Sequence, residues 1–91
     1  MTLMEALAME YLDKLLDVER AKDVDPSIVD PKERYRVREL RYMLTHAGFG
    51  YVCKHIEENV DEAVFSTAPG SPEESDILGE AVCFIHTYTH S

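Results

Sequence analysis

The chain has 91 residues, which is the size of one small domain and leaves room for only a thin hydrophobic core. Eighteen acidic residues against nine Lys and Arg give a net charge of −9, which argues against broad binding to nucleic acid or to anionic membranes. Two cysteines are too few for a disulfide scaffold, and no apolar run reaches the ~18–20 residues that cross a bilayer. We therefore expect one soluble domain, residues 1–91, located in the cytoplasm.

The first expected helix covers about residues 2–22. Thr2 and Glu5 have the spacing of a capping box, in which each side chain bonds to a backbone N–H near the start of the helix. Met9 and Leu16 make the apolar face wider than one neighbouring helix needs, which indicates a central helix or a second contact surface. The other apolar residues at helical spacing are Met4, Leu7, Ala8, Tyr11, Leu12, Leu15 and Val18.

Proline and glycine mark the ends of the second and third expected helices, about residues 31–47 and 51–65. Asp30 before Pro31 has the pattern of an N-cap followed by the first helical residue. After Gly48–Gly50 the apolar face changes direction, so one straight helix cannot bury both parts against the same neighbour. We therefore expect a break or sharp kink at these glycines, with a continuous helix as the alternative.

A turn at residues 67–72 leads into the fourth expected helix, about residues 72–90. Ser71 is placed to cap this helix, and Pro72 suits its first position. No stretch of the sequence alternates apolar and polar residues as a strand does. Short connections favour antiparallel neighbours, so we expect an all-α fold, a compact antiparallel bundle of three to four helices.

Acidic residues gather on the third and fourth helices near the turn that joins them. Within each helix two of them stand four residues apart, where like charges repel unless a cation lies between them. Mg²⁺ prefers carboxylate ligands together with water and substrate phosphates. The pattern predicts a magnesium site, with a solvated acidic face as the alternative. The residues are Glu57, Glu58 and Asp61 on the third helix, and Asp76 and Glu80 on the fourth.

Residues 52–88 resemble the all-alpha nucleotide pyrophosphohydrolases (MazG-like). In that family a Glu-Glu-x-x-Glu motif and a Glu-x-x-Asp motif on the next helix hold Mg²⁺. The resemblance lies in Glu57-Glu58-x-x-Asp61 and in Leu78-Gly79-Glu80-Ala81-Val82-Cys83-Phe84. Asp61 stands where the family has Glu, and Ile77 stands where it has an acid. The resemblance implies Mg²⁺-assisted hydrolysis of a nucleoside triphosphate, in which the metal activates water.

An arginine stripe on the second helix is the part of this acidic chain best suited to an anion. Arg34, Arg38 and Arg41 share one face, and Tyr35 and Tyr42 lie near its edges. Guanidinium groups bind phosphate oxygens in pairs, and aromatic rings stack on bases, so the stripe predicts a site for a phosphorylated small molecule such as a nucleotide. The alternative is ion pairing with acids of the first helix. Those acids are Glu10, Asp13 and Asp17.

A second stripe lies opposite the apolar face of the last helix. It consists of Gly79, Cys83, His86 and His90. Thiolate and imidazole are zinc ligands, although three ligands on one helix form an awkward geometry. Glycine lets another chain approach closely, so we expect an interface here, with zinc binding or an ordinary surface as alternatives.

Together these features predict a small acidic helical binding module that self-associates as a homo-oligomer and needs no cofactor. We expect it to capture a partner protein or a phosphorylated small ligand, and the negative charge suits a partner that is itself basic. Its size and acidity would suit an accessory or inhibitor protein of a mobile element. The alternative is a divergent Mg²⁺-dependent nucleoside triphosphate pyrophosphohydrolase, for which no general base or substrate pocket can be identified in the sequence.

Overall fold

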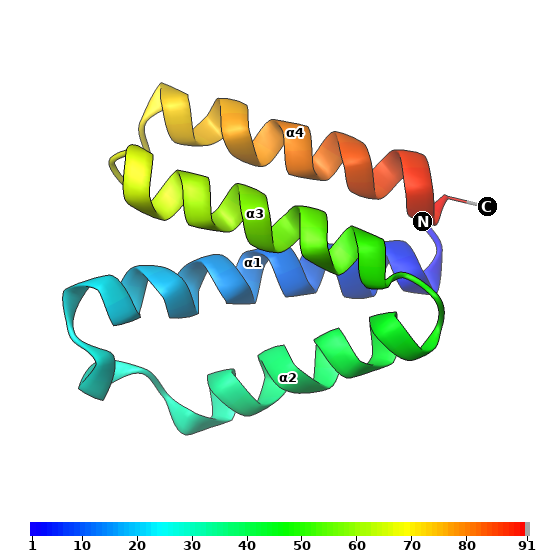
Figure 1. The fold of residues 1–91 in the computed structure, drawn as a ribbon, viewed down its shortest axis with the longest axis horizontal. Helices are drawn as coiled ribbons and strands as arrows, with labels where there is room; N and C mark the ends of the chain where they lie inside the picture. Colours follow the sequence, from blue (N-terminus) through cyan, green and yellow to red (C-terminus); the bar gives the residue numbers. More distant parts are fainter. Residues whose placement is uncertain (91) are drawn as a thin grey trace.

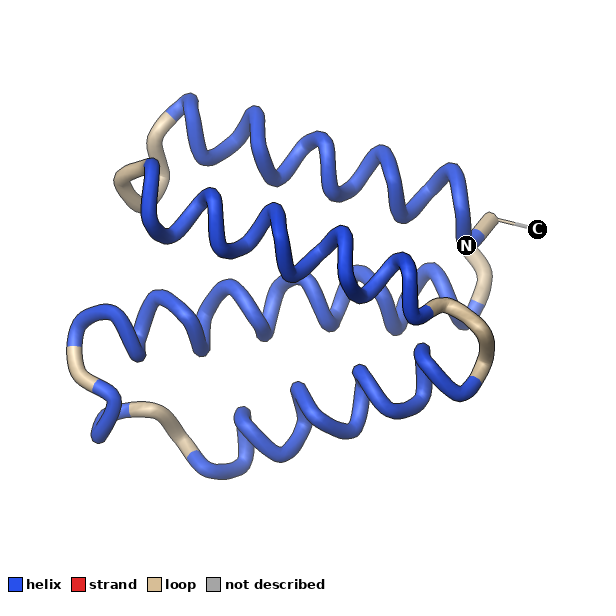
Figure 2. Tube along the Cα trace, viewed as in Figure 1, coloured by secondary structure: helices blue, strands red, loops and turns tan. Residues whose placement is uncertain are grey.

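Four α-helices joined by short connections make up the part of the chain that the computed structural model describes, residues 1–90 (Figures 1 and 2). No β-strand occurs among these residues, so the all-α prediction is confirmed, and every helix ends within two residues of its expected bounds. Consecutive helices run in opposite directions (Figure 1). The helices are α1 (Leu3–Val24), α2 (Pro31–His46), α3 (Gly50–Ser66) and α4 (Pro72–Thr89), with a 3₁₀ turn, η1 (Pro26–Ile28), between α1 and α2.

Hydroxyl groups cap the starts of α1 and α4, as the sequence predicts. Thr2 Oγ1 accepts a hydrogen bond from the backbone N–H of Glu5 at 3.1 Å, and Ser71 Oγ accepts one from the N–H of Glu74 at 3.2 Å. These bonds satisfy backbone donors that the first turn of a helix leaves without an internal partner. The Glu5 carboxylate binds His86 of α4, so only the Thr2 half of the expected capping box forms within residues 1–90.

The predicted break between the second and third helices is confirmed. Gly48 has a φ of +92°, in the left-handed region that favours glycine, and its N–H donates to the carbonyl of Thr45 at 3.0 Å. The N–H of Phe49 donates to the carbonyl of Leu44 at 2.9 Å. These two bonds form a Schellman motif, which ends α2, and α3 begins at Gly50.

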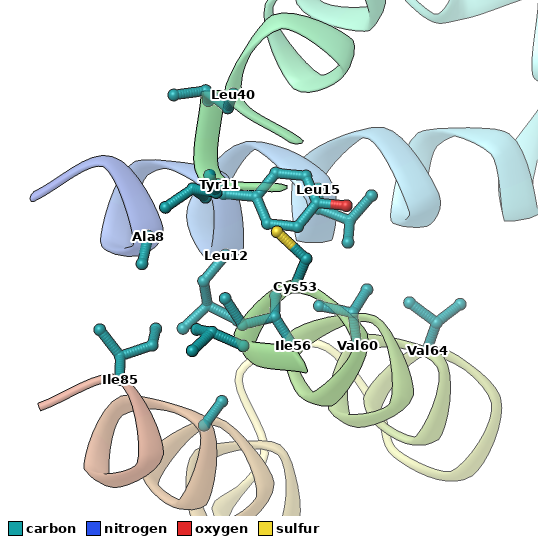
Figure 3. Close-up of a cluster of buried hydrophobic side chains, with 13 residues drawn as sticks. Ala8, Tyr11, Leu12, Leu15, Leu40, Cys53, Ile56, Val60, Val64 and Ile85 are labelled. Atoms are coloured by element: carbon teal, nitrogen blue, oxygen red, sulfur yellow. The ribbon is translucent and has the colours of Figure 1, made fainter. Parts of the chain in front are cut away.

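Helices α1 and α3 form the centre of the bundle, with α2 on one side and α4 on the other (Figure 1). Each central helix contacts all the others, whereas α2 and α4 do not touch within the described chain. The core draws on all four helices and includes the buried Tyr11, Leu40, Ile56 and Ile85 (Figure 3). The central position of α1 is one of the two explanations that its broad apolar face allowed. Across residues 1–90, no helix combines the length and the apolar character that crossing a membrane would require.

Candidate functional site

An open apolar groove runs between α1 and α4. Its volume is about 460 Å³. Met9 and Leu16, which widened the apolar face of α1 in the sequence, are only half-buried here, so α1 is a central helix that also offers a second apolar surface. The groove is lined by Met9, Leu12, Leu16, Leu78 and Val82, together with Glu10 and Asp13.

Acidic side chains surround the adjoining hollow between α1 and α2. This hollow of about 220 Å³ shares Asp13 with the groove and also contains Asp17, Asp30 and Glu33. Its only Lys or Arg is Lys14, whose Nζ lies 3.1 Å from Glu33 Oε2. Burial raises the pKa of Asp17, and the nearby charges of Asp13 and Glu33 raise it further. We call the groove and this hollow together the acidic–apolar face.

The three arginines of the α2 stripe do not act as one set. Arg41 Nε donates to Glu57 Oε2 of α3 at 2.7 Å, and the hydroxyl of the buried Tyr11 donates to the same oxygen at 2.5 Å. Burial and this carboxylate raise the pKa of Tyr11, so it stays a neutral donor. Arg34 and Arg38 instead line a separate hollow of about 170 Å³ between α1 and α2, and neither forms an ion pair with any residue from 1 to 90.

The alternative for the arginine stripe was ion pairing with acids of α1. Arg36, which lies outside the stripe, forms such an ion pair with Glu10. Its Nε and Nη2 donate to the two carboxylate oxygens of Glu10 at 2.7 and 2.8 Å. Such a two-pronged bond matches the planar guanidinium to the carboxylate, and it holds the pKa of Glu10 below its ordinary value. The anchoring of α2 on α1 therefore does not occupy Arg34 or Arg38.

The tyrosines beside the stripe do not line the hollow that contains Arg34 and Arg38, which we call the arginine hollow. Tyr35 is 69% exposed, and Tyr42 is 64% exposed with its ring stacked on His46 at a centroid distance of 4.7 Å. Of the five residues predicted to bind an anion, the structure thus brings Arg34 and Arg38 into one hollow, and leaves Arg41 and both tyrosines outside it.

The predicted magnesium ligands are not brought together. Glu57 turns toward α1 and α2, where Tyr11 and Arg41 engage it, rather than toward α4. Within residues 1–90, no group of three or more His, Cys, Asp or Glu side chains is placed to hold one metal ion. The remaining four predicted ligands lie exposed on α3 and α4: Glu58, Asp61, Asp76 and Glu80.

The predicted interface stripe on α4 divides into two parts. Gly79 and Cys83 are exposed, and a Cβ added at Gly79 would meet no other atom within 4 Å. His86 reaches across to the buried carboxylate of Glu5 on α1, and this hydrogen bond holds the pKa of Glu5 below its ordinary value. His90 is the exposed C-cap residue of α4. His86 therefore ties two helices of the bundle together, and only the Gly79 part offers an open surface.

Aromatic rings form a ladder across α3 and α4 that the sequence pattern did not reveal. The ring of His55 stacks on Phe84, with centroids 3.8 Å apart and planes 9° apart, and Phe84 lies 4.4 Å from Tyr88. Tyr51 meets Tyr88 edge to face at 5.8 Å. Both tyrosines are half-exposed, and the ladder borders a hollow that also contains Cys83. The open part of the α4 stripe is therefore continuous with an aromatic surface.

Arg20 of α1 is a further residue that no sequence motif singled out. Its Nη1 donates to the carbonyls of Val64 and Thr67 at 3.4 and 3.1 Å, and its Nη2 donates to the carbonyl of Ala63 at 3.1 Å. Nη2 also lies 2.6 Å from Glu74 Oε2 of α4. Because the last carbonyls of a helix have no partner inside it, Arg20 acts as the C-terminal cap of α3. All these partners are more than 40 residues away along the chain, so local patterns carry no signal for them.

Comparisons with protein-family models, with curated proteins and with solved structures found no match to this chain. The resemblance of residues 52–88 to the all-alpha nucleotide pyrophosphohydrolases therefore stays a prediction. A function has to follow from the surfaces themselves, of which the acidic–apolar face and the arginine hollow have the most distinct chemistry.

Proposed function

We propose that this protein is a small binding module whose acidic–apolar face captures a basic amphipathic helix of a partner protein. The observation that carries the proposal is the groove between α1 and α4. Met9, Leu16 and Val82 remain half-exposed there, directly beside the carboxylate of Asp13. Apolar side chains in a concave surface gain free energy when a partner covers them, by about 25 cal/mol per Å² of apolar area removed from water.

The position of the groove between two helices and its apolar lining favour a helix as the occupant. Amphipathic helices bind by laying their apolar stripe into a groove between two helices of the receptor. The volume of about 460 Å³ falls within the range of pockets that bind compact ligands, roughly 300–1,000 Å³. The flanks of the groove are already helical, so no part of the receptor has to become ordered on binding.

The charges beside the groove favour a basic occupant. Four acidic side chains surround the adjoining hollow, and Lys14 is the only Lys or Arg in its lining. The four are Asp13, Asp17, Asp30 and Glu33. The whole chain carries a net charge of −9, which adds long-range attraction for a cationic partner and speeds its association. The polar side of a Lys- or Arg-rich helix would lie against these carboxylates.

The same charges argue against a second copy of this chain as the occupant. A two-fold contact presents the same surface from both partners, so Asp13 and Asp17 of the two copies would approach each other. Like charges brought together in an interface cost free energy. Self-association is therefore better suited to the aromatic surface of α3 and α4.

The proposal can be tested with a fluorescently labelled synthetic peptide that carries Leu on one helical face and Lys on the other. We expect Leu16→Gln to weaken binding about tenfold, because one apolar side chain is lost from the groove. Asp13→Asn should slow association and reduce the salt dependence of binding. Phe65→Gln and Glu62→Gln remove an exposed apolar side chain and an exposed carboxylate elsewhere, and they should bind the peptide as wild type does.

Two outcomes would overturn the proposal. Equal binding by wild type, Leu16→Gln and Asp13→Asn would show that only the overall charge attracts the peptide. Equal binding of a control peptide with Glu in place of Lys would show that the carboxylates of this face do not select the partner.

A further inference from the structure

Arg34 and Arg38 form no ion pair within the described chain. Five other basic side chains each form an ion pair with a carboxylate. They are Lys14, Arg20, Lys22, Arg36 and Arg41. Four basic side chains form no such pair within the described chain, although the protein carries twice as many acids as Lys and Arg. Two of these four share one hollow. The four are Lys32, Arg34, Arg38 and Lys54.

The arginine hollow has an apolar floor and a cationic rim. Leu15 and Val18 of α1 and Val37 of α2 form its apolar lining, and Arg34 and Arg38 extend from successive turns of α2. An anion that contacts this apolar floor loses part of its hydration on that side, which strengthens its attraction to the guanidinium groups. The hollow is therefore better suited to a charged group than a flat basic surface would be.

Lys22 of α1 adds a third cation to the same hollow. At present its Nζ lies 3.2 Å from Glu19 Oε1, and both side chains belong to the lining. An exposed ion pair of this kind contributes little free energy, so a multiply charged anion can replace Glu19 as the partner of Lys22. Glu19 in turn repels an incoming anion, and its removal should strengthen binding.

We propose that the arginine hollow binds the terminal phosphate of a small phosphorylated molecule. The fork of each guanidinium matches two phosphate oxygens, and two arginines one turn apart can hold the three terminal oxygens between them. The volume of about 170 Å³ is below that of a pocket for a whole drug-sized ligand, so the hollow takes the phosphate and leaves most of the molecule in solvent. This site shares only Val18 with the lining of the acidic–apolar face.

Binding is tested by isothermal titration calorimetry of the full chain with pyrophosphate as the probe at low ionic strength. We expect Arg34→Gln and Arg38→Gln each to weaken binding about tenfold, since each removes charge-assisted hydrogen bonds. Lys54→Gln is the matched control, because it removes the same charge from an exposed position on α3 and should bind as wild type does. Glu19→Gln should bind more tightly, whereas Glu62→Gln should not.

Further probes distinguish the sources of the phosphate. Inorganic phosphate, adenosine triphosphate and adenosine are titrated in parallel, with adenosine expected not to bind. Binding of adenosine would overturn the proposal, as would the absence of pyrophosphate binding. Equal losses in Lys54→Gln and Arg38→Gln would also overturn it, because the overall charge would then account for the binding. Arg34→Gln should still bind the synthetic peptide with Leu on one helical face and Lys on the other as wild type does. The phosphate-site proposal and the peptide-binding proposal can therefore fail separately.

Discussion

The guanidinium of Arg20 in α1 lies 2.6 Å from the carboxylate of Glu74 in α4, although 54 residues separate the two along the chain. The same carboxylate accepts a hydrogen bond from the N–H of Gly70 in the turn between α3 and α4. The bonds from Arg20 and Gly70 hold the pKa of Glu74 below its ordinary value. Because Arg20 also caps α3, one side chain fastens three helices at the end of the bundle opposite the termini (Figure 1).

Replacing Arg20 should destabilise the fold without altering the binding surfaces. Arg20→Ala removes one donor from the carbonyls at the end of α3 and leaves the half-buried Glu74 with only the N–H of Gly70, so we expect a loss of about 2–4 kcal/mol in the free energy of unfolding. Arg20→Lys keeps the charge but not the fork, and should recover only part of this loss. Urea denaturation followed by circular dichroism measures both, and a change below about 0.5 kcal/mol in Arg20→Ala, as for ordinary surface substitutions, would contradict this role.

The hydroxyl of Tyr11 should contribute measurably to stability through Glu57. Tyr11→Phe keeps the buried ring but removes the donor to Glu57 Oε2, and we expect a cost of about 1–2 kcal/mol. In a Glu57→Gln background the hydroxyl bonds to a neutral acceptor, so the same substitution should cost less. A double-mutant cycle by thermal denaturation gives the coupling, and a coupling energy near zero would show that the two side chains do not interact.

The contact between Glu5 and His86 predicts how stability depends on pH. Because the pKa of Glu5 is lowered in the folded state, its ionised form stabilises the fold above the unfolded value of 4.5, and this contribution is lost as the pH falls through the folded pKa. Glu5→Gln should therefore be less stable than wild type near neutral pH, with the difference shrinking in acid. Denaturation across the acid range tests this, with Glu62→Gln as the control. A difference that stays constant with pH would refute it.

Gly79 allows self-association to be tested without damaging the monomer. The position is exposed, lies within α4 and has open space around it, so Gly79→Ala should stabilise the helix by about 0.8–1.0 kcal/mol. We expect Gly79→Leu to weaken any oligomer that uses this surface, whereas Ala6→Leu on α1 should not. Sedimentation velocity at micromolar concentration measures both variants. A wild-type protein that is strictly monomeric there would contradict the predicted homo-oligomer.

The enzymatic alternative has a direct test. Since Glu57 is engaged by Arg41 and the other predicted ligands are spread along α3 and α4, we expect no Mg²⁺-dependent release of pyrophosphate from nucleoside triphosphates. A phosphate assay after pyrophosphatase treatment detects such release. Release that Glu58→Ala abolishes would establish the pyrophosphohydrolase reading in place of the binding module.

Local patterns in the sequence were sufficient to locate the helices. The apolar spacing, the caps at Thr2 and Ser71 and the break at Gly48 involve residues only a few positions apart, so local interactions specify them. The same is true of the wide apolar face of α1, which the structure places at the centre of the bundle with part of it left open.

Only the tertiary structure decided which charged groups meet. The helical spacing places Arg34, Arg38 and Arg41 on one face of α2. Because α3 packs beside α2, Arg41 forms an ion pair with Glu57, whereas the other two arginines form no ion pair within residues 1–90. The cap that Arg20 provides for α3 depends in the same way on how α1 crosses it. Which residues far apart along the chain come into contact depends on how each helix is rotated and shifted against its neighbours. The periodic pattern of a sequence specifies neither the rotation nor the shift.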